Sequence, residues 1–197
     1  MNKESTDFLV FLHNNKLINL ANIQDHNHNG FNSRLRLQKL VFIAQSRFNL
    51  PEKYFYSLYK HGPYSPKLTD DSYELDLTSL EEFQEEMDRY NDSYSLPSGF
   101  NQDKFVTLLL DKNNDWLEIA STLIEIKDNS DDIEKSSLIE IVSNYKPNYA
   151  IQYIEKVFEQ LSREKLILTI IEEMDDVVNK NPDIFEALEK EDITLIK

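Results

Sequence analysis

Glycine is scarce in this chain, and its scarcity limits the folds open to it. Three glycines occur in 197 residues, Gly30, Gly62 and Gly99, each more than thirty residues from the next. Phosphate-binding loops and dinucleotide fingerprints need glycines close together, so that backbone can approach the phosphate. Nucleotide enzymes of these classes are therefore excluded. So few glycines also disfavour a turn-rich β fold and favour helices joined by polar loops.

Hydrophobic periodicity predicts a mainly α protein with a small β component. In the first helical stretch, for example, Phe8, Phe11 and Leu12 recur near helical spacing. Ser33 is the expected N-cap of the second helix, after a polar loop over 22–32. The predicted helices cover 5–20, 34–49, 66–77, 78–90, 102–111, 116–127, 133–144 and a segment that begins near 149.

Residues 54–60 alternate aromatic side chains in a way that predicts a short strand. Even-numbered rings such as Tyr54 fall on one side of it, and odd-numbered rings such as Phe55 fall on the other. His61-Gly62-Pro63 is expected to turn the chain. Ser65-Pro66 then starts a helix, because a serine hydroxyl can cap the first turn and proline loses no hydrogen bond at the first helical position.

We expect one mostly helical domain over residues 1–161 and a C-terminal helical extension over 162–197, packed on that domain or on a partner. The length of 197 residues is enough for one sizeable core. No apolar run approaches the roughly 18 residues of a membrane span, and the N-terminus lacks the features of a secretory signal. The absence of cysteine excludes disulfides and thiol catalysis. A cytoplasmic protein without a membrane segment is therefore expected.

Charge is distributed unevenly along the chain. The formal net charge is −15, from 21 basic and 36 acidic residues. Residues 1–70 hold nine basic and five acidic residues, a net of +4, whereas the remaining 127 hold twelve and thirty-one, a net of −19. Two explanations stay open: acidic helices that keep the protein in solution, or a basic contact face on an acidic body. A strongly negative protein is a poor general nucleic-acid binder, although a local basic face can still bind phosphate.

Two segments resemble motifs of known families. Leu37–Gln45 (LQKLVFIAQ) resembles a helix of Panacea-type (SocA-like antitoxin) proteins and of the YwgA-type family, and Tyr59–Leu68 (YKHGPYSPKL) resembles a turn of YwgA-type proteins. Tyr94–Gly99 is similar to a strand and turn that serves as a wing, so a second short strand is expected over 93–96. The resemblance covers about 35–161. It implies a winged-helix-like fold without known catalytic residues and, for Panacea-type members, neutralisation of a toxin by direct protein contact.

Candidate catalytic or metal-ligating groups are few. Asp25-His26-Asn27-His28 has a spacing that can bind zinc, but the same residues are typical of a solvated polar loop, and no metal site is predicted. His61 is suited to acid–base chemistry near neutral pH, but a structural or hydrogen-bonding role is favoured, because no nucleophile or carboxylate constellation around it is readable. Adjacent residues on a helix point about 100° apart, so paired glutamates such as Glu81 and Glu82 are interpreted as solvated side chains and not as catalytic pairs.

The sequence therefore favours a non-enzymatic interaction or regulatory protein that acts through protein–protein contacts, with an antitoxin-like role as one form of this. Its partner is expected to be another protein or a second copy, without a cofactor. The alternative is a winged-helix nucleic-acid-binding transcriptional regulator that uses a local basic face. Against it, the exposed side of the helix predicted over 66–77 is expected to carry Asp70, Asp71 and Glu74, whose carboxylates would repel phosphate. A hydrolase is a third hypothesis. The candidate partner-binding residues are Arg34, Arg36, Lys39, Arg47, Lys60, His61, Tyr64 and Lys67.

Overall fold

The computed structural model describes residues 3–23, 25–51, 54–73, 95–130 and 132–168. It is mainly helical with one two-stranded antiparallel sheet, which confirms the predicted fold class. The chain divides into two compact units, the first ending at Glu125 and the second beginning at Ile126, within helix α6 (Asn114–Asp128). The boundary predicted between residues 161 and 162 stays a prediction, because 169–197 lie outside the described residues.

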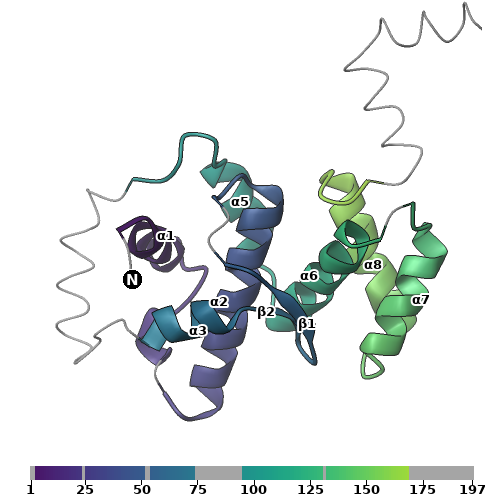
Figure 1. Ribbon diagram of the computed structural model, residues 1–197, viewed down its shortest axis with the longest axis horizontal. Coiled ribbons are helices and arrows are strands. Elements are labelled where there is room, and N and C mark those ends of the chain that lie inside the picture. Colours follow the sequence, from purple (N-terminus) through teal and green to yellow (C-terminus); the bar gives the residue numbers. More distant parts are fainter. Residues whose placement is uncertain (1–2, 24, 52–53, 74–94, 131, 169–197) are drawn as a thin grey trace, which may run out of the picture. The chain divides into compact units, whose positions relative to one another are not determined.

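Helix α2 (His28–Arg47) runs through the middle of the first unit (Figure 1). The prediction that Ser33 caps this helix is wrong, because the cap is Asn27, whose side-chain oxygen accepts a hydrogen bond from the Gly30 N–H at 3.0 Å. Asparagine is among the strongest N-cap residues, so the polar loop ends earlier than its composition indicates. The helix stops shortly before Asn49, which adopts the left-handed φ of 57°.

An aromatic core joins the first helix to the rest of this unit. Helix α1 (Lys3–Asn14) ends before its predicted limit at residue 20, where the short 3₁₀ helix η1 (Leu20–Asn22) begins. Helix α5 (Gln102–Leu109) packs Phe105 against the ring of Phe48, with centroids 5.0 Å apart at nearly right angles. The five rings of this core, all at most 5% exposed, are Phe8, Phe11, Phe48, Phe100 and Phe105.

Strands β1 (Ser57–Tyr59) and β2 (Gly62–Tyr64) form a hairpin in which Leu58 pairs with Pro63. The predicted turn at 61–63 is therefore only partly right: Lys60 and His61 make the turn, and the next two residues belong to β2. The prediction that even- and odd-numbered aromatic residues lie on opposite sides is confirmed, since Tyr54 is buried and Phe55 is 90% exposed.

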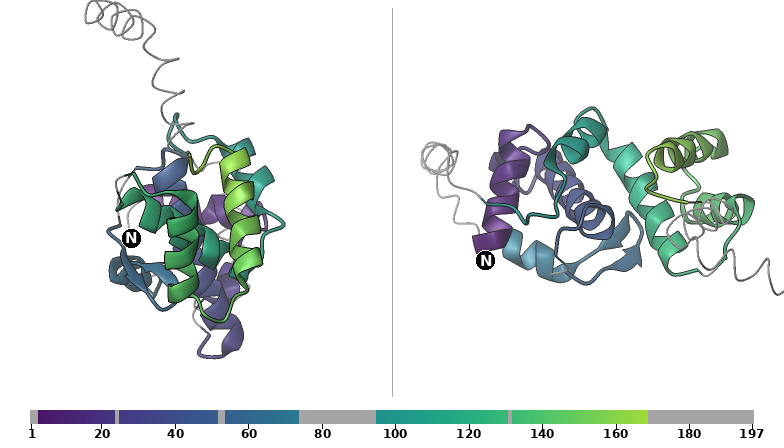
Figure 2. Two further views of the ribbon diagram at one scale, coloured as in Figure 1. Left: turned by 90° about the vertical axis from the view of Figure 1, so that its right-hand side faces the viewer. Right: turned by 90° about the horizontal axis from the view of Figure 1, so that it is seen from above.

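Helix α3 (Pro66–Tyr73) follows the hairpin directly (Figure 2). Ser65 stands immediately before it, as predicted, and its hydroxyl lies 3.5 Å from the Leu68 N–H. The expectation that Asp71 lies on the exposed side is wrong: it is 2% exposed and accepts hydrogen bonds from Tyr54 and Lys67. The helix predicted over 78–90 lies outside the described residues. So does the first half of the strand predicted over 93–96, and its described residues, 95 and 96, are not in a strand.

The second unit contains helices α7 (Lys135–Tyr145) and α8 (Ile151–Arg163), which pack against each other. Their apolar faces meet, and Lys135 extends from α7 across the Phe158 ring to an ion pair with Glu159 at 3.5 Å. None of the described helices is long and apolar enough to cross a membrane.

Candidate functional site

Two polar residues of α2 are buried and hold the hairpin in place. The Gln38 side-chain amide donates to the Ser65 carbonyl and accepts from the Ser65 N–H, both at 2.9 Å. The same amide donates to the Thr69 hydroxyl at 2.9 Å. Beside it, the Lys39 ammonium, on a residue only 1% exposed, donates to the Pro63 carbonyl at 2.5 Å. A buried charge needs such partners, so both side chains are part of the framework.

Gly62 lets the hairpin approach α6 closely. Its φ of 83° lies in the left-handed region, which favours glycine. A Cβ atom at this position would lie 2.7 Å from the Thr122 hydroxyl oxygen and 3.4 Å from both the Glu118 carbonyl oxygen and the Lys39 nitrogen. A side chain at this position would therefore press on the Thr122 hydroxyl of α6.

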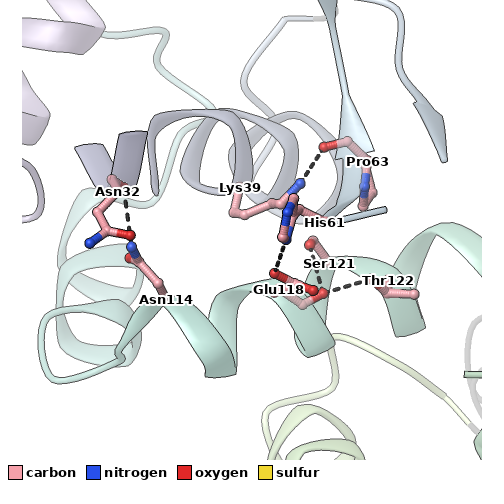
Figure 3. Close-up of polar contacts among 8 residues, drawn as sticks. All are labelled: Asn32, Lys39, His61, Pro63, Asn114, Glu118, Ser121 and Thr122. Carbon is pink, nitrogen blue, oxygen red and sulfur yellow. Dashed lines mark hydrogen bonds and ion pairs between the residues drawn. The ribbon is translucent and has the colours of Figure 1, made fainter. Parts of the chain in front are cut away.

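His61 is fixed at the tip of the hairpin by a carboxylate of α6. Its Nδ1 lies 3.1 Å from Glu118 Oε2 (Figure 3), and the Phe31 ring packs edge-on at 5.6 Å. Glu118 is nearly buried, whereas the His61 side chain is 43% exposed. The nearby α6 hydroxyls, on Ser121 and Thr122, donate to the Glu118 backbone carbonyl. The carboxylate therefore sets the orientation of an imidazole that faces solvent.

A cavity of about 420 Å³ opens within the first unit, beside the junction where α2 meets the β1–β2 hairpin. Its volume falls in the range of about 300–1,000 Å³ that is common for ligand sites. One face of α2 lines it with residues three and four positions apart: Phe31, Arg34, Leu35, Gln38 and Lys39. The hairpin and α3 complete the lining with Tyr59, Lys60, His61, Gly62, Tyr64, Thr69 and Tyr73. Within the described part of the chain, no aspartate or glutamate lines the cavity.

The structure brings five of the eight predicted partner-binding residues to this cavity: Arg34, Lys39, Lys60, His61 and Tyr64. These five residues differ in their exposure and in the hydrogen bonds that they already make. Arg34 donates to the Ile23 and Asp25 carbonyls at 2.6 and 2.8 Å, and Lys39 is buried. Lys60 is exposed, and His61 is partly so. Of these five residues, the most exposed one, Lys60, is therefore on the hairpin.

The other three predicted residues do not line the cavity. Arg36 links elements of the first unit: its guanidinium donates to the carbonyls of Leu17, Leu109 and Lys112. Burial lowers the pKa of this arginine. Lys67 pairs with Asp71 at 2.5 Å, and Arg47 donates to the carbonyl of its neighbour, Ser46. Whether any of the eight binds a partner stays a prediction.

No group of three or more histidine, aspartate or glutamate side chains that could hold a metal ion occurs among the described residues. His26 lies in the exposed loop before α2, and His28 is the first residue of that helix.

Comparison with protein-family models, curated proteins and solved structures finds no match for this chain. The resemblance to Panacea-type and YwgA-type proteins therefore stays a prediction. The structure does show how its two segments relate: Gln38 and Lys39 of the first bond directly to Ser65 and Pro63 of the second. The residues that carry the resemblance thus build the junction beside the cavity.

Sequence reasoning missed several residues that line the cavity, notably Phe31, Leu35, Thr69 and Tyr73. A signal for the first two was present, because they share the helical face that carries Arg34 and Gln38. The contribution of α3 had no such signal, since it depends on how the hairpin positions that helix.

Proposed function

We propose that this chain is a non-enzymatic interaction protein and that a partner protein docks at the α2–hairpin–α3 cavity. Three aromatic rings at the cavity carry the proposal: Phe31, Tyr59 and Tyr73 are 42%, 58% and 45% exposed. Tyrosine, phenylalanine and arginine are enriched in the central contacts of protein interfaces, where covering their surface supplies binding energy. Rings exposed around a concave, positively charged site fit that use.

The framework behind the cavity supports the same role. Gln38 and Lys39 fix the hairpin relative to α2, so less conformational freedom is lost when a partner binds. The Ser121 and Thr122 hydroxyls of α6 both donate to the Glu118 backbone carbonyl. An antitoxin-like role is one form of this function, and it rests on the resemblance. A cytoplasmic location and a winged-helix-like fold stay predictions.

Photocrosslinking tests the proposal directly. A benzophenone amino acid placed at Tyr59, in cells of the native host, should yield a covalent adduct with another protein. The same probe at Tyr145, which is 55% exposed in the second unit, is the matched control. If the partner is a second copy, the adduct should have about twice the mass of the 23.2 kDa chain. Equal adducts from both positions, or none from Tyr59, would refute a protein contact at the cavity.

Nucleic-acid binding is the second candidate, because Tyr59 and Tyr64 place two rings beside Lys60, a combination that can stack bases. Anisotropy with a labelled single strand and a labelled duplex at about 50 and about 200 mM salt tests it. Affinity that falls steeply with salt and depends on Lys60 would favour this candidate.

A further inference from the structure

The lining of the cavity indicates what kind of partner segment it accepts. Arg34, Lys39 and Lys60 contribute positive charge, His61 adds a polar ring, and no carboxylate lines the cavity within the described residues. Glu118 lies behind His61 and pairs with it. The charge that the cavity presents is therefore opposite in sign to that of the whole chain, which is −15. An anionic group is therefore attracted to the cavity.

We propose that the cavity binds a short acidic peptide segment in which a carboxylate stands next to an aromatic or aliphatic side chain. This inference rests on the proposed function and names the chemistry of the partner. The carboxylate would meet Lys60 at the mouth, and the apolar side chain would cover the Phe31, Tyr59 and Tyr73 rings.

Each lining group has a part in this assignment. Arg34 lies 5.7 Å over the Tyr73 ring while donating to two carbonyls, so it fixes one wall. Tyr59 and Tyr64 meet edge-to-face at 5.4 Å and form another. The Lys39 ammonium is buried and acts through its field. Direct contact with a carboxylate is therefore expected from Lys60, since the Nδ1 atom of His61 already faces Glu118.

A peptide fits these observations better than a small molecule or a nucleic acid. Small-molecule sites enclose about 70–90% of their ligand, whereas the rings here remain about half exposed and would be covered only by something larger. A nucleic acid carries a phosphate at every nucleotide and needs basic residues along its path. Asp70 is exposed on α3 next to the cavity residue Thr69, and Lys67 is paired with Asp71. A peptide with one or two carboxylates meets the positive groups only.

Selection from a random library of 12-residue peptides displayed on phage tests the proposal on the purified full chain. Enriched peptides should carry aspartate or glutamate beside an aromatic or aliphatic residue. The best peptide is then labelled, and its Kd is measured by fluorescence polarisation. Lys60→Glu should weaken binding about tenfold or more, as should Tyr59→Ala.

Two matched variants control for general effects. Lys156→Glu makes the same change of charge at an exposed position of α8, and Phe55→Ala removes a ring that is 90% exposed but does not line the cavity. Both should leave Kd within about twofold of wild type, and circular dichroism should show that every variant is folded. All substituted residues are exposed.

The outcomes separate this inference from the proposed function. No enrichment, enrichment of neutral or basic peptides, or equal losses in the control variants would overturn the acidic-peptide assignment. Tighter binding of a twelve-nucleotide deoxythymidine strand at the same residues would also overturn it. If Tyr59 nevertheless crosslinks to a protein whose contacting segment lacks acidic residues, the interaction function stands and only the assigned chemistry fails.

Discussion

Replacing Gly62 with alanine should strongly destabilise the first unit, for two separable reasons. The left-handed φ of 83° costs a non-glycine residue about 1–2 kcal/mol. The new Cβ atom would also stand 2.7 Å from the Thr122 oxygen, and overpacking of this kind costs about 1–3 kcal/mol. Alanine restricts the unfolded chain and offsets about 0.4–1 kcal/mol. The expected net loss in the free energy of unfolding is therefore roughly 1–4.5 kcal/mol.

Urea unfolding followed by tryptophan fluorescence is suited to this measurement. The chain has one tryptophan, Trp116, which is buried in α6 within the first unit. Its signal therefore reports the unit that contains Gly62, even if the second unit unfolds separately. Midpoint and slope together give the free energy of unfolding for each variant.

Two further variants separate the causes. In a Thr122→Ala background the crowded hydroxyl is gone, so Gly62→Ala should lose only the backbone cost less the unfolded-chain offset, about 0–1.6 kcal/mol. Gly99→Ala is the control, because a Cβ there meets only Asn49 at an ordinary 3.7 Å. It should leave the free energy of unfolding unchanged or raise it by up to about 1 kcal/mol, through the unfolded chain alone. If Gly62→Ala lowers stability no more than Gly99→Ala does, the close approach of the hairpin to α6 is refuted.

Three further predictions concern polar groups that are buried or half-buried. Gln38→Met keeps the size of the side chain but leaves the Ser65 N–H and carbonyl unpaired, so urea unfolding should show a loss of about 2–4 kcal/mol; a change below about 0.5 kcal/mol would contradict a structural role. Arg36→Lys should cost about 1.5–3 kcal/mol in the same assay, because an ammonium cannot reach the carbonyls of Leu17, Leu109 and Lys112 together; full stability would mean that these bonds contribute nothing. Burial lowers the pKa of His13, outweighing the opposing effect of its backbone hydrogen bond at Ile18. The unfolded chain therefore takes up the proton first as pH falls, so the free energy of unfolding should decrease below about pH 6.5, and His13→Gln should flatten that decrease.

The sequence predicted the elements whose signals are local. The Ser65-Pro66 start of α3 and the alternating sides of the strand region depend on neighbouring residues only, and both are present. The start of α2 was missed because asparagine, histidine and glycine near position 27 are typical of loops. Asn27 in fact serves as the cap. Because asparagine favours both turns and helix caps, its presence alone does not decide whether a loop continues or a helix begins.

The candidate site was only partly predictable, because charged residues are normally assigned to the surface. Arg36 and Lys39 were expected to contact a partner, yet both donate to carbonyls from within the first unit. Their partners lie far along the chain, such as Lys112, 76 positions from Arg36. No local pattern reports such a bond. Lys60 and His61, on the hairpin turn, line the cavity and reach its surface.

The two bonds between Gln38 and Ser65 have a consequence for association between chains. One residue in a sheet normally offers its N–H and its carbonyl to a neighbouring strand, and an uncovered edge invites a foreign strand to pair with it. Here a side-chain amide occupies both groups just past the end of β2. The amide makes the same pair of hydrogen bonds as a residue of a neighbouring strand, but no backbone follows it to continue the ladder. Gln38 thus occupies the two backbone groups through which a foreign strand would pair at this position.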